Sequence, residues 1–440
     1  MANTRRHSLK KPDSFKKTVF SNRLTLLSER QKMKSLAIGI WLKVGTRYEG
    51  AKEAGVSHFL EHMLFKGTPT RGALEIAREV DRVGGEFNAF TAREYTCFHI
   101  YLLNRDLDLA LDILSDILLN STFDAAELER ERKVILQEIS MVDESPEELA
   151  YDSFFEQLYG RHGLGKPILG SESSIRRMSR GDLLKFFRKH YSPERTIVSV
   201  VGDVSHERIK KKLKALTRSK WIGRPKLRSK MEIGFQPAPA LKIGRWWRVR
   251  PLEQVHIVWG VPGPTHSSKD RYAAHLLNVH LGGGMSSVLF QEIREKNGLA
   301  YTVYSSISPF VDSGVFTIYA ATSMHQVPLC LKLIEETIVK VKKDLLTQEE
   351  MKSVKDSLKG TVLLSSDSTE SRMFSIARNE IFLDQHVGVE EICEQLDRVT
   401  PQDIRRVARK ILRQDRRSIL FLGPKPRPQM ISRLKPLKFL

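Results

Sequence analysis

A weak internal repeat constrains the fold of this 440-residue chain more than any other feature of its sequence. Four short segments recur at offsets of 218 to 221 residues: 39–41 at 257–259, 99–101 at 317–319, Asp182 at Asp403, and Gly202 at Gly423. Recurrence at a nearly constant offset predicts a duplicated domain of about 200 residues.

Both halves alternate amphipathic helical patterns with short strand-like runs in a mixed order. This predicts an α+β fold built from two tandem homologous α/β domains. Residues 221–241 contain three prolines and show no sustained period, so we expect a linker there. The predicted units are a basic disordered arm over 1–15, a first domain over 16–220, the linker over 221–241, and a degenerate second copy over 242–440.

The most informative motif is H-x-x-E-H in the first copy, formed by His58, Glu61 and His62. On a helix these three side chains share one face. Two imidazoles and a carboxylate in an apolar run need a common partner, and zinc is the usual one. This order of residues is the inverzincin signature. The alternative is a pair of core histidines with a satisfied glutamate.

The second copy lacks this constellation. At an offset of 218, His58 and Glu61 are replaced by Leu276 and Val279, and only His62 is matched by a histidine. If the motif served packing alone, we would expect an equivalent in both copies. The difference favours chemistry in the first copy only.

A catalytic zinc needs a third protein ligand. Residues 131–138 (ERKVILQE) place Glu131 and Glu138 seven positions apart, on one face of a predicted helix. Spacing alone leaves open that both are surface acids of an amphipathic helix.

Five motifs together resemble the pitrilysin or insulinase family of zinc peptidases, in the short two-domain form similar to mitochondrial processing peptidase. They are residues 55–68 (GVSHFLEHMLFKGT), 84–91 (GGEFNAFT), 131–138, 281–287 (LGGGMSS) and 294–301 (REKNGLAY). The resemblance implies Zn²⁺ as cofactor, with His58, His62 and Glu138 as ligands. It further implies Glu61 as general base and Glu131 as a carboxylate behind the ligands.

The same resemblance implies that each chain forms half of a clamshell. Tyr301 would stabilise the oxyanion, and Arg294 would hold a substrate carbonyl. We expect a homodimer, or a heterodimer with a paralogue, in which these two residues serve the zinc of the other chain.

The segment after Gly84 is predicted to be an edge strand beside the zinc helix, where an extended peptide could add as a further strand. The expected peptide-binding residues are Gly85, Phe87, Asn88, Ala89 and Phe90. The alternative is an ordinary internal strand. Nearby, residues 134–160 contain seven acids and no Lys or Arg, which predicts attraction of basic substrate side chains unless these acids are simply solvated.

The net charge of +20 suggests polyanion binding, but the basic residues are scattered and no nucleic-acid module is present, so we expect no specific nucleic acid. No apolar run is long enough for a membrane span. Cys97, Cys330 and Cys393 fit free thiols in a reducing compartment, the cytoplasm or an organelle matrix. The sequence therefore predicts a zinc endopeptidase acting on extended or unfolded peptides. The alternative is a non-catalytic scaffold or partner subunit of a processing-peptidase-like complex.

Overall fold

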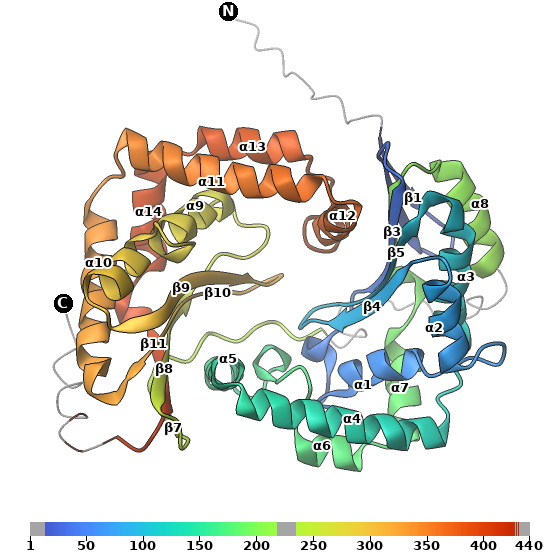
Figure 1. Ribbon diagram of the computed structural model, residues 1–440, viewed down its shortest axis with the longest axis horizontal. Helices are drawn as coiled ribbons and strands as arrows, with labels where there is room; N and C mark the ends of the chain where they lie inside the picture. Colours follow the sequence, from blue (N-terminus) through green and yellow to red (C-terminus); the bar gives the residue numbers. More distant parts are fainter. Residues whose placement is uncertain (1–13, 218–234, 427, 429, 431–440) are drawn as a thin grey trace, which may run out of the picture.

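The computed structural model describes residues 14–217, 235–426, 428 and 430, and shows two α/β halves side by side (Figure 1). The first half contains β1 (Phe15–Val19), β2 (Thr25–Arg30), β3 (Ser35–Leu42), β4 (Glu86–Thr91), β5 (Thr96–Leu103), β6 (Thr196–Gly202), α1 (Val56–Leu64), α2 (Ala73–Asp81), α3 (Leu107–Asn120), α4 (Ala125–Glu144), α5 (Pro146–Tyr159), α6 (Glu172–Arg177), α7 (Arg180–His190) and α8 (His206–Thr217). The second half contains β7 (Arg245–Val249), β8 (Gln254–Pro262), β9 (Ala300–Pro309), β10 (Gly314–Ser323), β11 (Ser418–Gly423), α9 (Arg271–Gly282), a π-helix η5 (Phe290–Lys296), α10 (Val327–Lys343), α11 (Gln348–Ser366), α12 (Thr369–Leu383), α13 (Val389–Arg398) and α14 (Pro401–Ile411).

The two sheets have the same topology. The first runs β1-β2-β6-β3-β5-β4 and the second β7-β11-β8-β10-β9, so the orders coincide once β1 is set aside. The parallel pair β2 and β6 corresponds to the parallel pair β7 and β11, and the other neighbours are antiparallel in both sheets. The predicted α+β duplication is confirmed.

One repeat anchor is out of register. Trp41 packs on the face of the first sheet that meets Met373 of α12, whereas Trp259 points into the core of its own half. Because side chains alternate along a strand, the two tryptophans cannot be equivalent positions, so the offset of 218 is wrong here. The second copy still lacks the H-x-x-E-H motif, because α9 contains no Asp or Glu that another register could align with Glu61.

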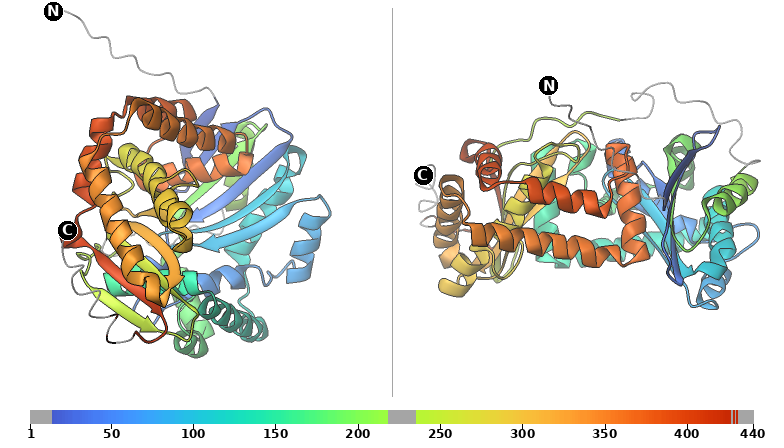
Figure 2. Two further views of the ribbon diagram at one scale, coloured as in Figure 1. Left: turned by 60° about the vertical axis from the view of Figure 1, so that its left-hand side comes forward. Right: turned by 90° about the horizontal axis from the view of Figure 1, so that it is seen from above.

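Each half covers the other's sheet with one helix. Helix α5 of the first half packs Phe154 and Phe155 against the second sheet, in a cluster with Val258 and Leu420. Helix α12 of the second half covers the first sheet, where Met373 is fully buried. Figure 2 shows α11 and α12 (orange) extending toward the first sheet (blue). The halves are therefore interlocked by reciprocal helix packing.

Buried ion pairs cross the same boundary. Arg372 of α12 donates from Nε to Glu29 of β2 at 3.0 Å. Arg47, whose side chain is fully buried, pairs with Glu94 of its own half at 2.6 Å and, across the boundary, with Asp312 of the second half at 2.7 Å. Removing one partner of such a pair leaves an uncompensated buried charge, so these contacts fix how the halves meet.

Parts of two predicted segments lie outside the described residues, namely 1–13 of the arm and 221–234 of the linker. In the described part of the chain, none of the helices combines the length and apolarity needed to cross a bilayer.

Candidate metal centre

Helix α1 is anchored at its start by a buried carboxylate. Gly55 precedes the helix with a left-handed backbone (φ +87°), and the Glu49 oxygens accept hydrogen bonds from the backbone N–H groups of Gly55 and Ser57, both at 3.0 Å. These donors would otherwise be orphaned. Burial raises the pKa of Glu49 to about 7. Glu49 thus positions the helix that carries the H-x-x-E-H motif.

The same helix is held in the core by its apolar residues. Phe59, Leu60, Met63 and Leu64 are all completely buried. His58 and Glu61 are each 9% exposed, so both side chains lie in the protein wall with only a small opening toward solvent. This packing fixes the two imidazoles and the glutamate with little freedom.

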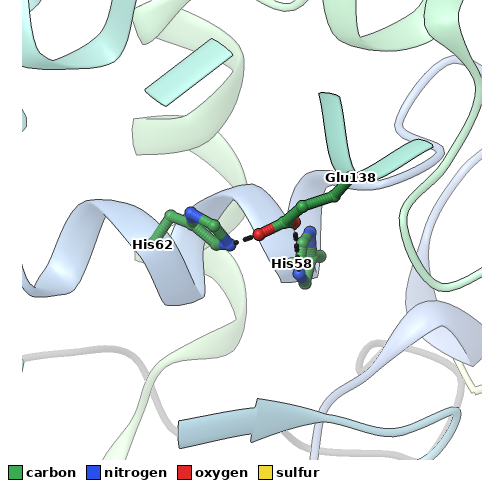
Figure 3. A group of neighbouring side chains, drawn as sticks. All are labelled: His58, His62 and Glu138. Carbon is green, nitrogen blue, oxygen red and sulfur yellow. Dashed lines mark ion pairs between the residues drawn. The ribbon is translucent and has the colours of Figure 1, made fainter. Parts of the chain in front are cut away.

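Helix α4 brings the third candidate ligand, Glu138, to the two histidines. Its N-terminus is capped by Asp124, and it packs along α1 so that Glu138 reaches both rings (Figure 3). Glu138 Oε2 lies 3.6 Å from His58 Nε2 and 3.5 Å from His62 Nε2. All three ligand atoms lie within 4.8 Å of one another, and no other such His, Cys, Asp or Glu group occurs in the described ranges.

These separations fit a zinc ion. A tetrahedral zinc with ligand distances of about 2.0–2.2 Å places its ligand atoms roughly 3.3–3.6 Å apart. The two carboxylate–imidazole distances agree with that spacing. Burial, with a smaller contribution from the His62 ring, lowers the pKa of His58 to about 3. His58 is therefore neutral at physiological pH, the state that binds a metal.

A second carboxylate supports His62 from behind. Glu131 Oε2 lies 2.9 Å from His62 Nδ1, and its other oxygen accepts from Lys66 Nζ at 2.7 Å. This contact fixes the tautomer that leaves Nε2 free for a metal. His58 Nδ1 is buried and has no such partner among the residues described.

Glu61 lies beside the ligands without joining them. Its Oε2 accepts a hydrogen bond from Thr91 Oγ1, at the end of β4, at 2.5 Å. Burial raises the pKa of Glu61, and the Thr91 hydrogen bond offsets part of that rise. A carboxylate with a raised pKa is a better proton acceptor near neutral pH.

A cleft of 710 Å³ opens onto this group. His58 and Glu61 line it together with Ala89, Phe90 and Thr91 of β4. Among the described strands, β4 is the edge of its sheet and pairs with β5 alone. The other predicted peptide-binding residues lie on the same stretch: Gly85 just before β4, and Phe87 and Asn88 within it.

Helix α5 supplies the acidic wall of the cleft. Glu147, Glu148 and Asp152 line it. Glu147 accepts a hydrogen bond from Tyr304 of β9 at 2.5 Å, and Asp152 lies 3.5 Å from Arg93. Glu148 has no basic partner in the described part of the chain.

Arg294 and Tyr301 lie elsewhere. They pair with each other where β9 begins, with the guanidinium 4.4 Å from the ring centre, and Tyr301 is 76% exposed. Neither lines the cleft that contains His58. The structure brings the three candidate ligands together with Glu61, but it does not bring Arg294 and Tyr301 to them.

Sequence reasoning missed several residues of the site. Glu49 caps α1 and Thr91 donates to Glu61, and no local pattern in the sequence predicts either contact. The contact of Tyr304 with Glu147 could not be predicted, because the repeat does not indicate how β9 packs against the first half.

The sequence is similar to those of known peptidases. Residues 24–172 match the family profile described as Insulinase (Peptidase family M16), and residues 177–358 match Peptidase M16 inactive domain. An uncharacterized zinc protease of Mycobacterium leprae is 39% identical over 394 residues, covering 89% of this chain and 87% of that protein. The uncharacterized zinc protease YmxG of Bacillus subtilis is 37% identical, covering 89% and 93%.

Among solved structures, a protease from Helicobacter pylori matches with a TM-score of 0.88 at 25% identity. The match covers 93% of this chain and 99% of that one. A Pseudomonas fluorescens structure described as a peptidase M16 inactive domain matches with a TM-score of 0.86 at 22% identity. At that identity the match supports a shared fold and nothing further.

Proposed function

Because the chain belongs to the insulinase family of peptidases, M16, whose cofactor is zinc, we propose that it is a zinc-dependent endopeptidase of the inverzincin type. Its substrates would be extended or unfolded peptides. The observation that carries the proposal is the convergence of His58, His62 and Glu138, with Glu61 beside them.

Each residue has a definite task in this proposal. When bound, zinc would lower the pKa of a water and polarise the scissile carbonyl. Glu61 takes the proton of the attacking water and returns it to the leaving amine. Thr91 occupies Glu61 Oε2, which leaves Oε1 for the proton. Glu131 holds His62 in the required tautomer.

The substrate backbone would pair with the free edge of β4. Such pairing reads the main chain, so sequence preference along most of the peptide should be loose. The acids of α5 add a local preference for basic side chains. Reversing the charge of Glu148 should weaken cleavage of basic peptides selectively; equal activity on basic and neutral peptides in that variant would remove this part of the proposal.

The oxyanion donors would come from a second chain. Arg294 and Tyr301 pair with each other outside the cleft, which fits residues that serve the opposite zinc of a dimer. Mixing His58→Ala chains with Tyr301→Phe chains should restore activity at one of the two sites. A mixture as inactive as either parent would refute the exchange, whether the natural partner is a copy or a paralogue.

We place the protein in the cytoplasm, because Cys97, Cys330 and Cys393 are all free thiols, two of them buried. A non-catalytic partner subunit is the competing function. It would bind zinc and peptide without cleaving.

The decisive comparison is wild type against Glu61→Gln, with Glu129→Gln as a control on the exposed face of α4. Each protein is assayed for zinc content and for cleavage of a fluorogenic peptide. The proposal predicts one zinc in all three and cleavage in wild type and Glu129→Gln only. Zinc-loaded wild type without activity, under conditions that allow dimerisation, would favour the partner subunit.

A further inference from the structure

A second cavity of 820 Å³ adjoins the zinc cleft. It is lined by the turn between β4 and β5, the end of β9, and helices α9, α11, α12 and α13. It shares four lining residues with the cleft: Thr91, Arg93, Ile168 and Ser308. We call this cavity the inner chamber.

The inner chamber carries excess positive charge. Four arginines line it, while Glu94 is the only acid among its lining residues in the described chain. Arg93 and Arg372 are neutralised by Asp152 and Glu29, and Glu94 is itself paired with Arg47. The charge of the chamber therefore comes from the remaining two arginines.

Those two, Arg271 and Arg378, have no carboxylate partner within the described residues. Arg271 stacks on Tyr272 with its guanidinium 4.5 Å from the ring centre, and its Nη2 donates a hydrogen bond to the Tyr272 hydroxyl at 3.1 Å. A guanidinium has five N–H donors, so Arg271 keeps donors for a carboxylate. Arg378 lies on α12 near a stacked pair formed by His266 and Phe382, whose ring centres are 3.6 Å apart. Burial, followed by the charge of Arg378, lowers the pKa of His266 to about 4, so the imidazole is neutral.

Strand β4 leads from one cavity to the other. Ala89 and Phe90 line the zinc cleft, Thr91 lines both cavities, and the turn that follows lines the inner chamber. A peptide paired with β4 rises about 3.3 Å per residue. A segment a few residues from the scissile bond would therefore enter the chamber.

We infer that the inner chamber binds a carboxylate of the same peptide, through Arg271 and Arg378. The carboxylate belongs either to an acidic side chain or to the C-terminus. Together with the acidic wall of α5, the chamber would select peptides that carry two opposite charges. A basic side chain would lie near the zinc, and a carboxylate would lie a few residues away. The inference rests on the proposed function and adds a substrate determinant to it.

The test measures binding separately from cleavage. In a zinc-loaded Glu61→Gln background, fluorescence anisotropy follows a labelled basic peptide made in four forms: with Glu or Gln at one distal position, each with a free or an amidated C-terminus. Arg271→Gln and Arg378→Gln are compared with Arg78→Gln, an exposed arginine of α2 outside both cavities. Neither chamber arginine forms an ion pair with another described residue, and Arg271→Gln gives up only the hydrogen bond to Tyr272, so both variants should fold.

The inference predicts that a carboxylate tightens binding by about tenfold, and that either chamber variant removes this gain, as expected for a charge-assisted hydrogen bond. Binding of the Gln amide form should stay the same in all variants. A gain from Glu identifies the side chain as the source, and a gain from the free terminus identifies the C-terminus. Equal binding of all four forms, or equal weakening of all four, would overturn the inference while leaving the peptidase proposal intact. Tight carboxylate-dependent binding with no cleavage by wild type would instead overturn the peptidase proposal alone.

Discussion

The carboxylate behind His62 offers a quantitative prediction. Replacing Glu131 by Gln keeps its size but removes its charge, while both of its contacts remain within reach: His62 Nδ1 at 2.9 Å and Lys66 Nζ at 2.7 Å. Glu131 is only 6% exposed, so solvent screens the interaction little. We expect weaker zinc binding, because the imidazole loses the negative partner that raises its basicity.

The size of the effect follows from the contact. Removing such a partner typically lowers metal affinity by about 10- to 100-fold, or roughly 1.4–2.7 kcal/mol. Gln can still accept one hydrogen bond, so Glu131→Gln should lower zinc affinity by about tenfold. Glu131→Ala should lower it by nearer a hundredfold. Lys66→Met should act in the opposite direction, because it removes a positive charge and leaves Glu131 wholly to His62.

Zinc affinity can be measured by competition with a chelating dye, using Glu129→Gln as a matched control on the same helix. The predicted order of affinity is Lys66→Met, then wild type with Glu129→Gln, then Glu131→Gln, then Glu131→Ala. Wild-type affinity in Glu131→Gln, or weaker binding in Lys66→Met, would refute the reasoning.

Three further predictions test the supports of the site. Glu49→Gln should destabilise the fold by about 1–3 kcal/mol through a lost cap acceptor. Since the folded-state pKa of Glu49 is raised, its stabilising contribution is lost as pH rises from 4.5 to about 7, so urea unfolding should show the gap between the two proteins narrowing over that range. Met373→Ala should cost about 2–5 kcal/mol in the same assay, because the side chain is fully buried between α12 and the first sheet; a loss below 1 kcal/mol would contradict that packing. Removing zinc with a chelator should lower the melting temperature of wild type but not of Glu138→Ala, and equal shifts would place the ion elsewhere.

The two histidines of the candidate metal centre could be predicted from the sequence because helical spacing is local. His58 and His62 lie one turn apart, and Glu138 could be added through family resemblance. The repeat located equivalent strands but not their register, since Trp41 and Trp259 are matched by identity and point to opposite faces. Both strands are buried at almost every position, so a one-residue slip hardly changes the match of apolar residues, although it moves each side chain to the opposite face.

Contacts between distant segments could not be predicted. An amphipathic pattern shows that α5 and α12 bury one face, but not that each buries it on the other half's sheet. Likewise, nothing local marks Glu49 as a cap six residues ahead of Gly55 or Thr91 as the partner of Glu61. These roles depend on how the chain returns to the site.

The central claim is that one ion is held jointly by the two rings of α1 and the carboxylate of α4. Anomalous diffraction at the zinc edge from crystals of the zinc-loaded protein tests it directly. The account predicts one strong peak per chain, bound by His58, His62 and Glu138. A peak bound by other side chains, or a zinc-loaded crystal in which Glu138 turns away from the ion, would contradict it.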